Sequence, residues 1–459
     1  MLGVRFLWID SLCIIQDDKD DWRSEAAHMA TIYESALVTI SADAASCSTD
    51  GFLAASTRQT KPHAEVPYSF TGATGHSVEG VVCVRERGKL GLLLPYHGLA
   101  GVRSQKETEY SWADEPEAPR SILSTRGWVF QERILSPRTL HFSEFEMAPY
   151  VYESLLKGLL VNDDDQEYFR DLWRVEVVQE YSRLALTFPQ DRLIALAGLA
   201  TAVGRLRPED QYVAGLWRSS LGEDLLWAVQ PIKASARLSS RPAASWSWGS
   251  ITGAVAYGRS SRHDLGRRRL SESFQVERVA VRFNGEDRFS DPLMGSSLKV
   301  MGQVLRGKLA GVAEQNKTWF VPGGWTPTSI YTGSSPVFSQ PAPSPGPFLV
   351  AWDVMTRETS RDDLRPYRDR QLLFLMVAEQ LGGPCGLLLE QKNSGSRSSS
   401  RCTCSRVGFV YSGEDSSPVP RRRGSTPDWA EEERQDRAQM SLTWKKWDKL
   451  SVKMKISIE

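Results

Sequence analysis

The first forty residues alternate between apolar and polar stretches in the order strand, loop, helix, strand. An apolar run over residues 4–9 ends at Asp10 and predicts a buried strand. The next apolar positions recur at helical spacing, and Asp20 or Asp21 is expected to cap that helix. A short strand is predicted over residues 38–40. The side chains on the predicted helical face are Trp22, Ala26, Met29, Tyr33 and Ala36.

A second patterned block, RGWVFQERILSPRTLHF, spans residues 126–142. Its spacing predicts a short helix with Trp128, Gln131 and Leu135 on one face, then a turn and a strand over residues 139–142. Another strand is expected near residues 78–84.

Beyond residue 150 the pattern is first helical and then mainly β. Helices are predicted over residues 166–187, over 192–203 after a cap at Asp191, and over 221–229. The alternation SWSWG at residues 245–249 predicts a strand with Trp246 and Trp248 on one face. We expect these two rings to form β core rather than a ligand platform. Further strands are predicted at residues 275–283, 297–313, 347–354 and 372–379.

The composition is that of a soluble globular protein, with 41% hydrophobic and 24% charged residues among 459. Lys plus Arg equals Asp plus Glu at 56 each, so no net charge favours nucleic acid or an anionic membrane. No apolar stretch reaches the roughly 18 residues of a membrane span. The six cysteines are mostly isolated, which suits a reducing compartment, and we expect a cytoplasmic protein.

The two patterned blocks together resemble the heterokaryon incompatibility (HET) domain of filamentous fungi. The resemblance rests on the sequence LWIDSLCIIQD with the following Asp-Trp, on the helix glutamate, and on the later RGWVFQERILSPRTLHF block. The family domain normally starts with a strand and a Leu-Ser-Tyr-x-Trp-Gly motif, which do not occur here. We therefore expect an N-terminally truncated α/β domain, TIR-like or flavodoxin-like, that lacks its first strand.

The expected organisation has four parts. They are a HET domain over residues 1–150, a helical region over 151–235, a mainly β region over 236–390, and a largely disordered tail over 391–459 with a short strand near 406–412.

The resemblance implies a role in fungal non-self recognition. An effector of this kind triggers growth arrest or cell death, here by self-association of a TIR-like module or by association with another incompatibility protein. Two alternatives stay open: an NAD-cleaving hydrolase that uses Glu25, and an inactive truncated product. No cofactor is expected, although NAD is a possible substrate. No nucleic-acid or membrane partner is expected.

The candidate catalytic residues are Glu25 and Asp10. A carboxylate near the start of the predicted helix could hold a ribose hydroxyl or stabilise an oxocarbenium-like centre. The alternative role for Glu25 is that of a solvated glutamate favoured by the helix dipole. Asp10 could bind substrate or cap the following loop, and Gln16 and Asp17 share that choice.

In the second block, Arg126, Gln131 and Glu132 are candidate substrate-binding residues, because arginines there could clamp a phosphate or carboxylate. The alternative is an internal ion-pair network, including Arg133, that pins a helix to a sheet.

Cysteine chemistry and metal binding receive little support from the sequence. Cys13 lies between apolar neighbours and is expected to be a packed core thiol rather than a nucleophile activated by His28 or His141. Cys402 and Cys404 lack a second Cys/His pair at zinc spacing, so no metal site is expected.

Overall fold

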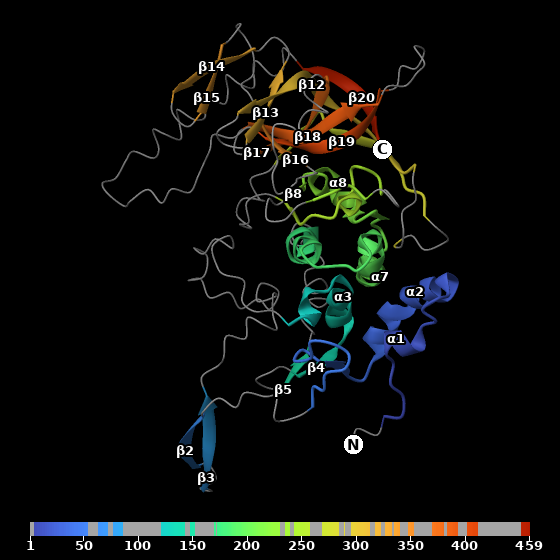
Figure 1. Cartoon of the computed structure of the whole chain (residues 1–459), viewed down its shortest axis with the longest axis vertical. Helices are drawn as coiled ribbons and strands as arrows, with labels where there is room; N and C mark the ends of the chain where they lie inside the picture. The colour runs from blue at the N-terminus through green and yellow to red at the C-terminus, as the bar shows by residue number, and fades with distance from the viewer. Residues whose placement is uncertain are drawn as a thin grey trace, which may run out of the picture. The chain divides into compact units, whose positions relative to one another are not determined.

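The computed structural model divides into two compact units, each described here by itself (Figure 1). Unit 1 comprises Met1–Asp163 with Leu184–Leu186, and unit 2 comprises Asp164–Arg183 with Thr187–Glu459. The structure describes residues 4–53, 63–71, 77–85, 121–142, 147–151, 169–170, 172–229, 235–238, 243–257, 269–283, 289, 295–312, 317–322, 326–332, 335–339, 348–352, 370–380, 383–392, 402–411 and 451–459. Most of the tail that we predicted to be disordered lies outside these residues.

The N-terminal part of unit 1 is built on one long helix, α2 (Lys19–Ser35). The predicted helix is confirmed, and Met29 of its predicted apolar face is buried, together with the neighbouring Ala30. Its cap is Asp18 rather than Asp20 or Asp21: the Asp18 carboxylate accepts the backbone N–H groups of both, at 2.8 and 3.2 Å.

The strand predicted over residues 4–9 does not form, and this prediction was wrong. These residues are in no strand, and a four-residue helix, α1 (Asp10–Cys13), begins where the strand was expected to end. Phe6 and Leu7 are 86% and 73% exposed. An apolar run becomes a strand only if a neighbouring strand pairs with it, and no strand in the described part of unit 1 does so.

The sheet of unit 1 has the order β1-β4-β5, made of β1 (Thr39–Ser41), β4 (Arg138–Phe142) and β5 (Met147–Val151). β1 and β4 are parallel, with Ser41 opposite His141, whereas β4 and β5 are antiparallel. The predicted strands near residues 38–40 and 139–142 are thus confirmed. Parallel pairing matters for function because it brings the carboxyl ends of two strands to the same edge of the sheet.

The described part of unit 1 contains four further elements. The hairpin of β2 (His63–Thr71) and β3 (Ser77–Arg85) contains the strand expected near residues 78–84. The 3-10 turn η2 (Leu123–Thr125) leads into α3 (Gly127–Leu135), the helix predicted from the second block. α3 packs against α2, and the rings of Trp22 and Trp128 meet edge to face at 5.9 Å between centroids.

Unit 2 begins with helices that are shorter and less regular than predicted. The longest are the π-helical η3 (Leu172–Gln179), which covers part of the predicted helix 166–187, and α7 (Ala197–Leu206). The predicted helix 221–229 is one turn long, because the chain turns into a strand at Ala228. The remaining elements here are α6 (Glu180–Ser182), η4 (Pro189–Arg192), η5 (Ile194–Leu196), η6 (Arg218–Ser220), α8 (Leu221–Asp224), β8 (Ala228–Val229) and β9 (Val255–Ala256).

The SWSW segment is a turn and not a strand. It leads into the 3-10 helix η7 (Trp248–Ser250), and both tryptophans are fully buried. Ser247 is buried as well, because its hydroxyl donates to Ala214 O at 2.6 Å and accepts Gly249 N–H at 3.0 Å. A hydrogen-bonded serine can point inward, so the alternation of serine and tryptophan carries no strand periodicity here. The prediction of a tryptophan core is confirmed, but its β geometry was wrong.

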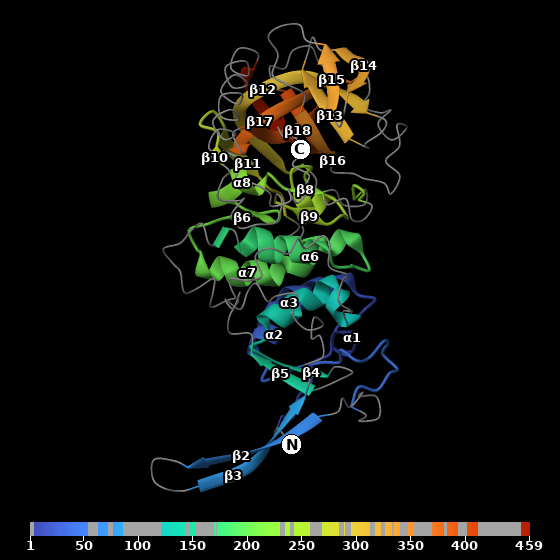
Figure 2. The same cartoon turned by 90° about the vertical axis from the view of Figure 1, so that its left-hand side faces the viewer.

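The C-terminal part of unit 2 is a closed antiparallel barrel (Figure 1 and Figure 2). Its sheet runs β10-β17-β18-β19-β16-β13-β12-β11, and an additional β17–β12 pairing closes the ring. β20 pairs antiparallel with the first half of β12 and parallel with the start of β19, and so connects these two strands. The strands are β10 (Arg269–Leu270), β11 (Gln275–Ala280), β12 (Ser297–Val312), β13 (Lys317–Pro322), β16 (Phe348–Trp352), β17 (Leu372–Gln380), β18 (Gly383–Gln391), β19 (Cys402–Tyr411) and β20 (Val452–Ile458), beside a separate hairpin of β14 (Thr326–Thr332) and β15 (Ser335–Ser339).

The barrel confirms the strands predicted in this region and contains others, such as β13 and β18, that were not predicted. Residues 372–378 of β17 are at most 1% exposed, because one face lines the barrel and α8 contacts the strand. Cys402 and Cys404 lie within β19, not in a disordered tail, and Cys404 is fully buried.

A buried arginine joins the barrel to the tryptophan-rich segment before it. Arg406 of β19 lies with its guanidinium 3.4 Å from the ring centroid of Trp227 and donates to Leu225 O at 2.6 Å. Its backbone N–H donates to Ser245 Oγ at 2.9 Å, and its carbonyl accepts from the Arg237 guanidinium. Ring face and carbonyl oxygens together stabilise a cation that is out of contact with water.

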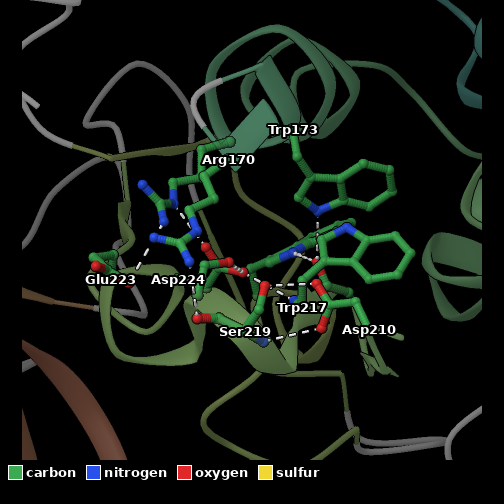
Figure 3. A network of polar contacts seen from close by, with 11 residues as sticks. Arg170, Trp173, Asp210, Trp217, Ser219, Glu223 and Asp224 are labelled. Atoms are coloured by element: carbon green, nitrogen blue, oxygen red, sulfur yellow. Dashed lines mark hydrogen bonds and ion pairs between the residues drawn. The ribbon is translucent and has the colours of Figure 1, made fainter. Parts of the chain in front are cut away.

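The hairpin of β6 (Tyr212–Val213) and β7 (Leu216–Trp217) is fixed by two aspartates (Figure 3). Asp224 accepts from Arg174 Nε at 2.6 Å and from Trp217 N–H at 2.9 Å. Asp210 accepts from the hydroxyl of Ser219 at 2.6 Å and from its N–H at 3.0 Å. The two carboxylates thus fix the end of β7 and the residues that follow it.

The two residues at the tip of this hairpin, Ala214 and Gly215, have positive φ angles of 51° and 95°. That is the backbone of a tight two-residue hairpin loop. The carbonyl of Gly215 accepts indole N–H groups from both Trp173, at 3.2 Å, and Trp248, at 3.0 Å.

Replacing Gly215 by alanine is expected to lower the free energy of unfolding by about 1–3 kcal/mol. The new Cβ would lie 2.7 Å from Trp248 Nε1, on a backbone that L side chains rarely adopt. Urea unfolding followed by tryptophan fluorescence measures the change. Gly51→Ala is the control, because no atom lies within 4 Å of its Cβ position. An unchanged unfolding midpoint for Gly215→Ala would contradict this account.

Candidate functional site

Residues from the two sequence blocks meet where α2 packs on α3. Tyr33 of α2 is hydrogen-bonded to Glu132 of α3, and Asp10 lies close enough to interact electrostatically with both. Arg126, at the start of α3, also acts on Glu132. Asp10, Arg126 and Glu132 were predicted as site residues, and the structure brings them together. Tyr33 was expected only as part of the apolar helix face.

Glu132 is the most perturbed acid of this group. Burial, reinforced by the negative charge of Asp10, raises the pKa of Glu132 to about 7, although the Tyr33 hydrogen bond and the charges of Arg126 and Arg133 oppose the shift. A carboxyl group with a pKa near neutrality can give or take a proton under cellular conditions. Burial also raises the pKa of Tyr33, so its hydroxyl stays protonated and donates to Glu132. The ring of Trp8 meets Tyr33 edge to face at 5.7 Å and fixes the N-terminal segment beside it.

Asp10 and Gln16 mainly order their own loop. The Asp10 carboxylate accepts Ser11 N–H at 2.7 Å, and its backbone carbonyl accepts from Gln16 Nε2 at 3.1 Å. Gln16 Nε2 also donates to Ile14 O at 3.0 Å. Asp10, Gln16 and Asp17 are all exposed. For Asp10 and Gln16 the loop-ordering alternative therefore describes the geometry, and Asp10 starts a helix instead of ending a strand.

Glu25 lies on α2 with its side chain 30% exposed, 4.0 Å from His28 Nδ1. This position agrees with the partly solvated helix glutamate of the alternative interpretation. Gln131 is fully buried on α3, whereas Arg126 is exposed at its start. Cys13, predicted to be a packed core thiol, is exposed, and its neighbour Leu12 is 79% exposed as well, so this prediction was wrong.

A second cluster, which the sequence did not reveal, centres on Asp43 just after β1. Its carboxylate accepts from Ser121 Oγ at 2.8 Å, from Arg133 Nη2 at 2.6 Å and from His141 Nδ1 at 2.7 Å. All four residues are buried. Burial by itself would raise the pKa of Asp43, but the His141 hydrogen bond and the Arg133 charge outweigh it, so this pKa is lowered.

This Asp43 cluster ties together four segments of the HET-like sequence: the residues after β1, the turn before η2, α3 and β4. The internal ion-pair network that we predicted as an alternative for the second block is confirmed for Arg133. The signal that could have revealed the cluster is the parallel register: Ser41 pairs with His141, so Asp43 emerges at the same sheet edge. Both clusters draw on α3, through its neighbouring residues Glu132 and Arg133.

Comparison with known families assigns the N-terminal part of the chain. Residues 1–132 match the family described as "Heterokaryon incompatibility protein (HET)", so the chain carries a HET domain. The match contains α1, α2, β1 and most of α3, and with them every residue of the α2–α3 cluster. No curated protein and no solved structure matches the chain. Among the described residues, no helix is long and apolar enough to cross a membrane.

Replacing Asp43 by asparagine is expected to lower the free energy of unfolding by about 3–5 kcal/mol, because it leaves the buried Arg133 guanidinium without its counter-charge. Asp17→Asn, at an exposed position, is the matched control. The pKa of Asp43 is lowered on folding, so its contribution is present above the unfolded pKa and is lost as the pH falls through the folded one. Urea unfolding should therefore show a large difference in midpoint between the parent protein and Asp43→Asn at pH 7, and a smaller difference in acid. Equal midpoints at pH 7 would refute the role of Asp43.

Glu132 predicts the opposite dependence on pH. The pKa of Glu132 in the folded state, about 7, lies above its value in the unfolded chain. Between these two pKa values the folded state binds more protons than the unfolded state. The free energy of unfolding should therefore fall as the pH rises toward 7. Glu132→Gln should remove this slope, whereas Glu25→Gln should leave it. The measurement is the urea midpoint between pH 5 and pH 7.5. A slope that persists in Glu132→Gln would assign the titration to another group.

Proposed function

We propose that the protein is an effector of heterokaryon incompatibility whose HET domain acts by self-association as a TIR-like signalling module. In this proposal the assembled domains trigger growth arrest or cell death when unlike fungal cells fuse. The partner is a second copy or another incompatibility protein. The family match over residues 1–132 supports the general role.

The observation that carries the association mechanism is an apolar stretch on the surface of the HET domain. Among residues 4–15, only Ile14 is a buried hydrophobic side chain. Phe6, Leu7 and Leu12 are 86%, 73% and 79% exposed. Contiguous exposed apolar groups of this size are typical of protein interaction sites. The exposed large hydrophobic residues of this stretch are Val4, Phe6, Leu7, Ile9, Leu12 and Ile15.

The α2–α3 cluster favours a second candidate, cleavage of NAD. Departure of nicotinamide from the ribose leaves an oxocarbenium-like centre, which water attacks to give ADP-ribose. Asp10 could stabilise the developing positive charge, and Glu132 could take the proton from water. Glu25 of α2, whose side chain is 30% exposed, is the alternative carboxylate. The raised pKa of Glu132 is the reason to test Glu132 beside Glu25.

Expression of the full chain in a filamentous fungus should arrest growth, and Phe6→Asp with Leu12→Asp should abolish the arrest by placing charges in the contact. Phe188→Asp, at a residue 59% exposed in unit 2, is the matched control and should remain active. Colony extension and vital staining are the readouts, with sedimentation of the purified proteins in parallel. Arrest by a double variant that sediments as a monomer would refute the association mechanism.

The same cultures separate the second candidate from the first. If NAD falls on induction, and Glu132→Gln or Glu25→Gln prevents both the fall and the arrest, the enzyme mechanism holds. Arrest with unchanged NAD supports association alone. A chain that does neither would be the inactive product.

A further inference from the structure

The HET domain contains two backbone segments that could form a strand pair and that, among the described residues, are not paired with each other. We call these segments the two halves. The first half is the backbone of residues 4–9. Its composition is that of a strand, with Val4, Phe6, Trp8 and Ile9, yet no strand in the described part of the domain pairs with it.

The second half is the outer edge of β1. Among the described residues, β1 is the terminal member of its sheet and pairs with β4 on one side. Leu37 and Ile40 next to this edge are 51% and 49% exposed. An exposed apolar edge is a template for another strand. With only three residues, β1 would gain length and hydrogen bonds from a second neighbour.

Within one chain, the two halves are held apart. The contact of Trp8 with Tyr33 fixes residues 4–9 against α2, and α1 begins directly afterwards at Asp10. Phe6 and Leu7 point into solvent as a result. A second copy carries the same two halves, and a two-fold arrangement would satisfy both pairings at once without leaving an edge for further growth.

We propose that residues 4–9 of one copy add as a strand to the free edge of β1 in a second copy, reciprocally across a two-fold axis. The proposal rests on the proposed self-association and specifies its geometry. Main-chain hydrogen bonds supply the pairing, and the apolar side chains of the added strand cover Leu37 and Ile40. The exposed surface is thus covered by a second copy of this protein.

Cross-linking between differently tagged full-length chains tests the geometry. Cys13, Cys47 and Cys83 are first replaced by serine. One chain then carries Phe6→Cys or Leu7→Cys, since neighbouring residues of a strand face opposite sides. The other carries Ile40→Cys, and a short bis-maleimide joins cysteines that lie side by side. Phe188→Cys replaces Ile40→Cys in the control, because Phe188 is 59% exposed and Ile40 49%.

Mixed dimers in severalfold excess over the Phe188→Cys control are expected for one of the two N-terminal positions. The strand exchange is rejected if no excess forms, or if a chain that carries both cysteines cross-links only within itself. Sedimentation of the parent chain distinguishes the two levels of the proposal. A dimer without the cross-link overturns the strand exchange alone, whereas a monomer overturns self-association itself.

Discussion

A charge that is removed from water must be matched within hydrogen-bond distance, and both units of this protein are arranged around that constraint. In unit 1, Arg133 is matched by the Asp43 carboxylate, which also binds Ser121 and His141. These contacts hold a helix, two strand ends and a turn that are far apart in the sequence. Unit 1 therefore has a buried ionic cluster that joins these segments.

Unit 2 meets the same constraint in two ways. Arg174 is paired with Asp224, whereas Arg192 and Arg406 donate to backbone carbonyls beneath tryptophan rings. Burial lowers the pKa of Arg192 to about 10, which leaves it charged in the cell. Each of these two arginines donates to a loop carbonyl and lies over a tryptophan ring, so it links the loop to Trp248 or Trp227. Trp227 and Trp248 thus have a partly electrostatic role beside their packing.

Local patterns in the sequence predicted α2, α3, β1, β4 and most strands of the barrel, because period and capping determine such elements. The failures involve partners distant in sequence. Residues 4–9 have strand composition but no strand neighbour, and SWSW alternates without forming a strand, because Ser247 satisfies its hydroxyl inside the core. Asp10, Arg126 and Glu132 were selected from their motifs, and the structure places them close together, while their functional role stays a prediction. Asp43 was missed because its significance depends on the parallel register between β1 and β4, which no local pattern reveals.

The closure of the barrel has a consequence for how the chain is made. β12 pairs Gln303 with Lys453, so its partner follows about 150 residues later on the ribosome. At typical elongation rates of about 5–20 residues per second, the edge of β12 that pairs with β20 stays open for roughly 8–30 seconds. During that interval the nascent chain exposes one unpaired strand edge, although β11 precedes β12 and β13 follows it closely. Biogenesis of the C-terminal half is therefore a kinetic problem of protecting one edge, whereas the local helices of unit 1 can form as they emerge.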